Sequence, residues 1–179
     1  GSLLGWHRNC LPIPWDTDVD VGVMIDDWCE SIIPAMQEAG FAYQRSVGSK
    51  RAGLTYVFKF GDLRQDIHFH YRKDNKMFIQ MWNKGEAYRA TVSAFERRPA
   101  DVFGMEIQVP HPAETYLTEL YGDFTAKRVK NEKGGDWYSL ASSPSVEVVT
   151  TKASGEPLVR QSRRLGKRKR RMANRWATT

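Results

Sequence analysis

The sequence lacks a hydrophobic run of membrane length and has few residues suited to covalent cross-links. None of its apolar stretches approaches the roughly 20 consecutive apolar residues of a membrane helix, so the chain as given is expected to be soluble. Its two cysteines, Cys10 and Cys29, are compatible with a disulfide or with two buried thiols. No spacing of histidine and cysteine suggests a zinc site. With 179 residues, the chain is long enough for one domain with a proper core.

The sequence also lacks an initiating methionine and a signal peptide. It opens on Gly1-Ser2, residues that already belong to a motif described below. We therefore expect a fragment, or a sequence that misses its beginning, with any membrane anchor or targeting signal in the missing N-terminal segment.

Positive charge is scarce in the folded part of the chain. The whole sequence has 27 basic and 21 acidic residues, but residues 151–179 hold 10 of the basic ones against the single acid Glu156. Residues 1–150 therefore carry 17 basic and 20 acidic residues. This balance argues against a nucleic-acid footprint across the fold. We expect 1–150 to be the folded domain and 151–179 a basic, disordered tail, in which residues 163–171 are a solvated charge run rather than a nuclear address or nucleic-acid arm.

Strand and helix patterns mix along residues 1–150. A short helix is expected near the start, a strand over residues 17–25, and a helix after Asp26-Asp27 that carries Trp28 to Ala39 at helical spacing. Further strands are expected over 41–46, 54–60, 65–71, 77–82 and 105–109, and a helix over 113–121. The fold class is therefore α/β (α+β).

The most informative segment alternates valine with aspartate. On a strand, Asp16, Asp18 and Asp20 would project from one face, while Val19 and Val21 project from the other. Two carboxylates about 7 Å apart repel by roughly 2 kcal/mol at an effective dielectric near 20, so a cation is expected to offset them. Hard divalent ions such as Mg²⁺ take oxygen ligands of this kind. From spacing alone, a solvated strand edge is the equal alternative.

A second alternating segment adds one more carboxylate. Asp66, His68 and His70 share one face of the strand expected over 65–71. If the two strands are neighbours, Asp66 completes a three-carboxylate site that can hold one or two Mg²⁺ ions. An ordinary polar strand face is the preferred interpretation of His68 and His70, ahead of metal ligation or proton transfer.

A third element is the glycine turn at the start. Gly1 allows backbone N–H groups to approach a phosphate, and the Ser2 hydroxyl adds a donor. Arg8 is a further candidate phosphate contact. Each of these signals is weak alone.

Together these motifs resemble the nucleotidyltransferase superfamily, and within it the LicD, fukutin and fukutin-related protein family. The likeness to the fukutin branch runs in order through residues 1–147 and covers the segments 1–10, 14–23, 38–40, 66–69, 121–122, 137 and 143–146. It implies a nucleotidyltransferase-like mixed sheet flanked by helices, truncated at the N-terminus of the fold.

The resemblance also implies a function and a location. Family members transfer a phosphate-bearing group from a CDP-activated donor to a glycan or glycoprotein acceptor. For the fukutin branch this is ribitol 5-phosphate from CDP-ribitol, placed on an O-mannosyl glycan in the Golgi lumen.

Carried over to this sequence, the resemblance makes Asp18, Asp20 and Asp66 the catalytic, metal-binding carboxylates. Asp16 is a further possible ligand, because some family members have an aspartate there. Gly1, Ser2 and Arg8 would lie near the donor phosphates, and Mg²⁺ or Mn²⁺ would be the cofactor.

Two alternatives stay open from the sequence. One is a nucleotidyltransferase that acts on RNA or protein with the basic tail as its nucleic-acid arm, which the acidic core disfavours. The other is a non-catalytic relative that serves as a binding module.

Overall fold

The computed structural model describes residues 1–14, 16–83, 86–125, 145–151 and 157–158. Within them lie three α-helices, an eight-stranded sheet and a two-stranded sheet, which confirms the predicted α/β (α+β) class. The elements in chain order are α1 (Ser2–Asn9), β1 (Asp18–Met24), the 3₁₀ turn η1 (Ile25–Asp27), α2 (Ile32–Glu38), β2 (Ala42–Ser49), β3 (Ala52–Phe60), β4 (Leu63–Lys73), β5 (Lys76–Asn83), β6 (Glu86–Ser93), β7 (Glu96–Val102), β8 (Met105–His111), α3 (Ala113–Tyr121), β9 (Val146–Thr151) and β10 (Pro157–Leu158).

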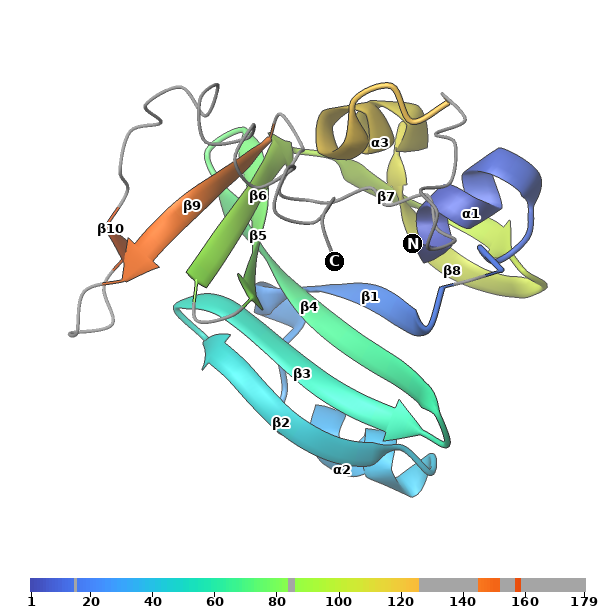
Figure 1. The fold of residues 1–179 in the computed structure, drawn as a ribbon, viewed down its shortest axis with the longest axis vertical. Helices are drawn as coiled ribbons and strands as arrows, with labels where there is room; N and C mark the ends of the chain where they lie inside the picture. The colour runs from blue at the N-terminus through green and yellow to red at the C-terminus, as the bar shows by residue number, and fades with distance from the viewer. Residues whose placement is uncertain (15, 84–85, 126–144, 152–156, 159–179) are drawn as a thin grey trace, which may run out of the picture.

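The long strand β4 organises the large sheet. Residues 64–70 of β4 run parallel to β1 on one side, and residues 63–68 run antiparallel to β3 on the other. Its end, residues 71–73, pairs with β5, and the sheet continues through β6, β9 and β10. A parallel pair needs a long crossover, which α2, β2 and β3 supply between β1 and β4 (Figure 1). This crossover makes β1 a direct neighbour of β4.

One face of the sheet is apolar and is covered by α2. Alternate residues of β3 and β4 point into this core, as the predicted period of two requires. The buried set is Leu54, Tyr56, Phe58, Ile67, Phe69 and Tyr71. Ile32, Ile33 and Met36 of α2 pack against it, and the indole N–H of Trp28 donates to the Tyr56 hydroxyl at 2.7 Å. Ile67, Phe69 and Tyr71 of β4 are thereby committed to packing.

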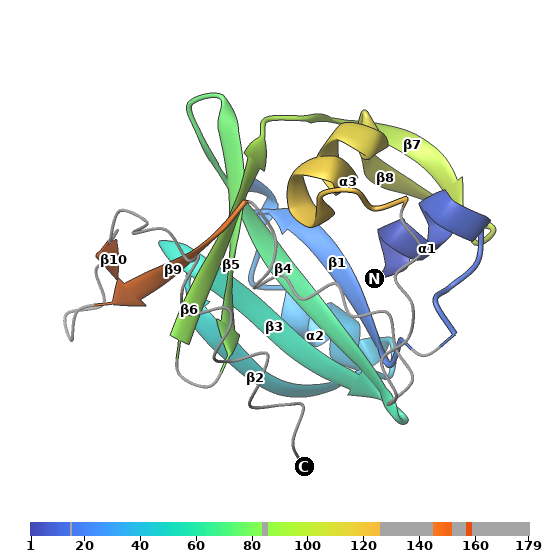
Figure 2. The same cartoon turned by 45° about the horizontal axis from the view of Figure 1, so that its top comes forward.

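The opposite face carries the polar residues and lies beside α1, α3 and the β7–β8 hairpin (Figures 1 and 2). Leu4 of α1 packs with Leu117 of α3 and with Phe124. Leu120 of α3 packs with β5 and β6 through Met77, Ala90 and Val92. These contacts fix both helices over the part of the sheet where β1 meets β4.

The helix predicted directly after Asp26-Asp27 begins later than expected. Residues 25–27 form the 3₁₀ turn η1, and α2 starts at Ile32. Pro34 gives the reason, since a proline is tolerated only in the first turn of a helix, where its missing N–H would have no partner. A helix from Trp28 would place Pro34 in its interior.

Four described strands escaped the sequence prediction: β6, β7, β9 and β10. β7 contains Pro99 and three charged residues before it, and it pairs only with β8 in the two-stranded sheet. A proline is accepted there because an edge strand need not donate every N–H group. In β6, the buried positions Ala87 and Ala90 are alanines, which are depleted in strands.

Several other expectations concern regions that the structure covers only in part. Most of the predicted tail, residues 152–156 and 159–179, lies outside the described residues, whereas Pro157–Leu158 pairs with β9. Residues 137 and 143–144 of the family resemblance also lie outside them. Cys10 and Cys29 are both exposed free thiols. Among the helices in the described ranges, none is both long and apolar enough to cross a bilayer.

Candidate active site

The predicted carboxylates meet where β1 runs parallel to β4. The register places Asp20 opposite Asp66 and Gly22 opposite His68. Because side chains two residues apart share a face, Asp18 and Asp20 project on the same side as Asp66 and His68. This face is opposite the one that α2 covers. The strand pairing therefore brings together acidic residues that lie more than forty positions apart in the sequence.

His68 connects three strands at this point. Its Nδ1 lies 3.1 Å from Oγ1 of Thr55 on β3, and its Nε2 lies 3.3 Å from Oδ1 of Asp20 on β1. An ionised carboxylate only accepts hydrogen bonds, so Nε2 carries the hydrogen in this contact. The preferred sequence interpretation made His68 an ordinary polar residue. The alternation already placed it beside Asp66, but only the neighbouring strand reveals its contact with Asp20.

Asp20, Asp66 and His68 form a group that can hold a cation. One ligand atom from each lies within 4.8 Å of the others. Ligands about 2.1 Å from a small divalent ion stand up to about 4.2 Å apart, so the spacing fits one ion after a small adjustment. The two carboxylates are oxygen ligands of the kind that Mg²⁺ and Mn²⁺ prefer, whereas the imidazole is more typical of transition-metal sites. Among the described residues, Asp18 lies beside this group of three rather than in it.

Arg64 is the positive partner of the cluster. Its Nε donates to one oxygen of Asp66 at 2.9 Å, and a terminal nitrogen donates to the other at 2.5 Å. The Asp66 side chain is only 6% exposed, so this two-point pairing offsets the cost of burying its charge. The hydrogen bond to Asp66 also raises the pKa of Arg64. Sequence reasoning missed Arg64, although it precedes Asp66 by two residues on the same strand face.

Negative charge remains unbalanced at Asp18. Burial, a hydrogen bond with Asp16 and the charges of Asp20 and Asp16 raise the pKa of Asp18 to about 6, although Arg64 acts in the opposite direction. Burial also raises the pKa of Asp20, but the hydrogen bond and charge of His68, together with the charges of the α-amino group and Arg64, outweigh it, so the pKa of Asp20 falls below its ordinary value. Neighbouring carboxylates with opposite pKa shifts are typical of functional sites.

The start of α1 lies against these carboxylates. A Cβ added to Gly1 would stand 1.9 Å from a carboxylate oxygen of Asp16, so a side chain there would require the Asp16 carboxylate to move. Ser2 and Leu3 line the same pocket as Asp20. The N–H groups of a first helical turn have no partner within the helix and favour an anion. The structure thus brings Gly1 and Ser2 to the carboxylate cluster.

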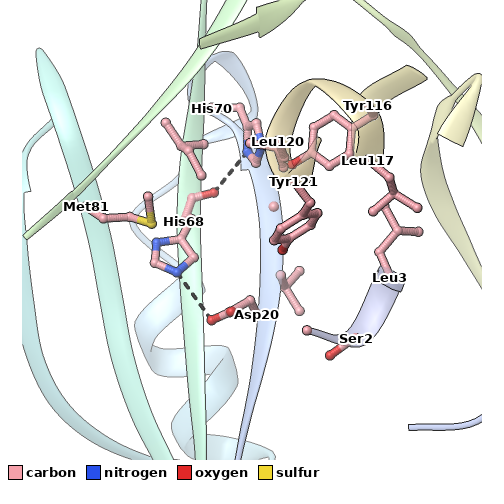
Figure 3. Close-up of a pocket in the computed structure, with 14 residues that line it drawn as sticks. Ser2, Leu3, Asp20, His68, His70, Met81, Tyr116, Leu117, Leu120 and Tyr121 are labelled. Atoms are coloured by element: carbon pink, nitrogen blue, oxygen red, sulfur yellow. Dashed lines mark hydrogen bonds and ion pairs between the residues drawn. The ribbon is translucent and has the colours of Figure 1, made fainter. Parts of the chain in front are cut away.

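Helix α3 forms one side of the pocket, which has a volume of about 110 Å³ and is open to solvent. Tyr116 and Tyr121 reach from α3 towards the strands that carry Asp20 and His68 (Figure 3). Burial, with the charges of Asp20 and Asp16, raises the pKa of Tyr121 to about 12, and burial also raises the pKa of Tyr116. Both hydroxyls therefore keep their protons at neutral pH. The sequence analysis missed Tyr116 and Tyr121, because a tyrosine in a short helix does not by itself indicate a functional site.

His70 packs on Gly22 at the edge of this pocket. A Cβ on residue 22 would lie 2.6 Å from Cε1 of His70, so the imidazole uses the space that glycine leaves. Nδ1 of His70 lies 3.3 Å from the carbonyl oxygen of His68 (Figure 3). Because a carbonyl only accepts, Nδ1 carries the hydrogen and Nε2 is the acceptor. Burial lowers the pKa of His70 to about 4, so the ring is neutral at pH 7.

Arg8 lies at the other end of α1. Its Nε donates to the carbonyl oxygen of Phe124 at 2.7 Å, and a terminal nitrogen donates to the same oxygen. This contact ties α1 to the segment after α3. The predicted contact of Arg8 with donor phosphates stays a prediction.

Comparison with known proteins supports the family resemblance. The family model described as LicD/FKTN/FKRP, nucleotidyltransferase domain, matches residues 1–112. The proteins named ribitol-5-phosphate transferase FKTN from Macaca fascicularis, Homo sapiens and Mus musculus are each 29% identical to this chain over 154 residues, which cover 82% of it. The chain spans 32% of the length of these relatives. Since the family model covers more than half of the sequence, including every acidic and histidine residue of the site, the chain belongs to the LicD/FKTN/FKRP nucleotidyltransferase-domain family.

Proposed function

We propose that this chain binds the activated donor in a metal-dependent phosphotransferase, which moves ribitol 5-phosphate from CDP-ribitol onto a glycan. The observation that carries the proposal is the convergence of Asp20, Asp66 and His68 in one pocket with the start of α1. The names of the relatives suggest the transferred group. The CDP carrier and the O-mannosyl glycan follow from the family resemblance.

Asp20, Asp66 and His68 would hold the cation, Mg²⁺ or Mn²⁺. For His68 to ligate through Nε2, its hydrogen would stand on Nδ1 instead, where the Thr55 hydroxyl oxygen can accept it. When bound, it would neutralise the charge of the donor pyrophosphate and the charge that develops during phosphoryl transfer. Asp18 and Asp16 would place further negative charge next to the cation and would contact it directly or through bound water. Arg64 holds the Asp66 carboxylate in place. Each oxygen of that carboxylate keeps a second lone pair that can bind the cation.

Gly1 and Ser2 would contact the donor phosphates. The Ser2 hydroxyl and the free N–H groups of the first turn of α1 are hydrogen-bond donors, as an anion requires. Tyr121 supplies a protonated hydroxyl to the same pocket. Arg8 would support this arrangement by holding α1 against Phe124.

In the proposed reaction, the acceptor hydroxyl oxygen forms a bond to the ribitol-bearing phosphorus of the donor. The bond from that phosphorus to the bridging pyrophosphate oxygen breaks, and CMP leaves with the electron pair. The hydroxyl proton passes to a carboxylate of the site. Asp18 is best suited to accept it, since its pKa of about 6 lies closest to neutrality.

The experiment that tests the proposal is a thermal-shift titration of the whole chain with Mn²⁺ and CDP. A ligand that binds only the folded state raises the melting temperature by mass action. We expect a rise in the parent chain that Asp20→Asn and Asp66→Asn each remove. Asp26→Asn is the matched control, because Asp26 is an exposed aspartate outside the cluster.

Each outcome separates the proposal from its alternatives. A folded parent without any shift would contradict the proposal and support a non-catalytic binding module. Salt-dependent RNA binding by the whole chain would instead support an enzyme that acts on RNA. The Golgi lumen is part of the proposal, and imaging of the full-length protein beside a Golgi marker tests it.

A further inference from the structure

A second cavity adjoins the candidate active site. It has a volume of about 120 Å³, is open to solvent, and shares Leu3, Gly22, His70 and Tyr116 with the first pocket. The rest of its lining comes from the end of β1 and from the β7–β8 region, namely Val23, Met24, Phe95, Arg97, Gln108 and Pro110. The proposed metal and donor sites do not use this second set. The two cavities are therefore adjacent compartments that meet at Gly22 and His70.

Aromatic rings form one side of the second cavity. Phe95 lies edge-to-face against Tyr116, with ring centroids 5.3 Å apart, and edge-to-face against His70 at 6.3 Å. Gln108 and Arg97 add an amide and a guanidinium from the hairpin. Aromatic faces pack well against C–H groups, and an amide both donates and accepts hydrogen bonds. Such a lining matches a sugar ring, which presents C–H groups on its faces and hydroxyls at its rim.

The charge of the second cavity favours a neutral ligand. A terminal nitrogen of Arg97 lies 3.1 Å from a carboxylate oxygen of Asp27, so its charge is already paired. In the neutral ring of His70, the hydrogen bond to the His68 carbonyl oxygen places the hydrogen on Nδ1 and leaves Nε2 as an acceptor. Phosphate groups, in contrast, would find the helix terminus of α1 in the first pocket. The first pocket therefore suits a charged donor, and the second cavity suits an uncharged acceptor.

We propose that this second cavity binds the saccharide acceptor, with the sugar ring against Phe95 and its hydroxyls on Gln108 and Arg97. The proposal rests on the proposed function, because it assigns the second substrate of the same reaction. A sugar in this place would direct one hydroxyl past Gly22 towards Asp20. Nε2 of His70 is the hydrogen-bond acceptor at that junction and would orient the hydroxyl, which makes His70 a positioning residue.

The test measures binding of a synthetic O-mannosyl glycopeptide to the whole chain by saturation-transfer NMR, with Mg²⁺ and CDP present. We expect transfer to the sugar protons in the parent. Gln108→Ala should weaken binding by roughly 5- to 30-fold, the effect of losing one to two hydrogen bonds of about 1 kcal/mol each. Phe95→Leu keeps an apolar side chain but removes the ring, and it should weaken binding as well. Gln37→Ala is the matched control, because Gln37 is an exposed glutamine of α2 on the other side of the sheet.

Unchanged glycopeptide binding in Gln108→Ala and Phe95→Leu would overturn the inference. Absent transfer in a parent chain that still responds to Mn²⁺ and CDP would overturn it too. Loss of the glycopeptide signal when CDP is added would assign the cavity to the nucleoside instead. Failure of the CDP shift itself would refute the proposed function, and a glycopeptide signal sensitive to Gln108 would then still identify a sugar site.

Discussion

The two faces of β4 show how one strand serves two purposes. Ile67, Phe69 and Tyr71 point into the core beneath α2, whereas Asp66, His68 and His70 point to the opposite side. The apolar face has one requirement, which is burial against other apolar groups. The polar face needs a separate partner for every group. It finds them in Arg64, Thr55, Asp20 and the His68 carbonyl oxygen.

This difference separates what the two faces contribute. The apolar face stabilises the fold, and the packing of any well-matched side chain would serve it. The polar face holds a carboxylate cluster whose charges are only partly balanced, which costs stability and prepares a cation site. Variants on the two faces should therefore differ in both stability and ligand response.

The largest effect is expected from Phe69→Ala on the apolar face. Phe69 is 1% exposed, and removing a buried phenyl ring typically costs about 3–5 kcal/mol of unfolding free energy. Urea unfolding followed by tryptophan fluorescence measures the loss. Phe60→Ala is the control, because Phe60 is 53% exposed on β3 and should lose far less. Equal losses in the two variants would show that the apolar face does not form the core.

A smaller loss is expected from Arg64→Gln on the polar face. The variant leaves the buried Asp66 carboxylate without its two-point partner, which should cost about 2 kcal/mol, since Arg64 itself is half exposed. Saturating Mg²⁺ should restore part of this stability by supplying another positive charge. Urea unfolding with and without Mg²⁺ measures both effects, with the exposed Arg45→Gln of β2 as control. A variant as stable as the parent in the absence of Mg²⁺ would show that the ion pair contributes nothing.

The sequence alone was sufficient to predict the apolar face of β4 and to place Asp66, His68 and His70 on its polar face. Alternation over residues 65–71 predicted both faces of β4, because strand geometry leaves a side chain only two directions. The alternation of valine with aspartate in the earlier segment predicted that Asp18 and Asp20 share a face. The site prediction assumed that the strand of Asp18 and Asp20 lies beside the strand of Asp66. The sequence did not predict this pairing of β1 with β4, since no local pattern encodes which strands become neighbours.

The partners of the polar groups could not be predicted for the same reason. Thr55 reaches His68 through the register of β3, and Tyr121 reaches the pocket because Leu117 and Leu120 dock α3. These contacts depend on tertiary packing. Local propensity also failed at β7, where Pro99 and its charged neighbours resemble a loop and only the pairing with β8 makes a strand.

A stabilising effect is expected from Asp18→Asn, and it should depend on pH. Because the folded-state pKa of Asp18 is raised to about 6, its ionisation disfavours the folded chain as pH rises from about 4 to about 6. The variant should match the parent below pH 4 and exceed its stability above pH 6, by about 1 kcal/mol, because solvent screens the partly exposed Asp18 carboxylate. Unfolding curves from pH 4 to pH 8 without metal measure this difference, with Asp26→Asn as control. A difference that is constant with pH would contradict the raised pKa.

The smallest effect is expected from Glu114→Gln, which tests what holds the helices over the polar face. Nε2 of His7 on α1 lies 3.0 Å from a carboxylate oxygen of Glu114 on α3, but the Glu114 side chain is 64% exposed. Exposed ion pairs typically contribute about 0–1 kcal/mol, and the buried contact of Leu4 with Leu117 remains intact in the variant. We therefore expect a change below about 0.5 kcal/mol in urea unfolding and an unchanged melting-temperature shift with Mn²⁺ and CDP. A clear loss of that shift would mean that the ion pair, rather than apolar packing, sets the position of α1 at the site.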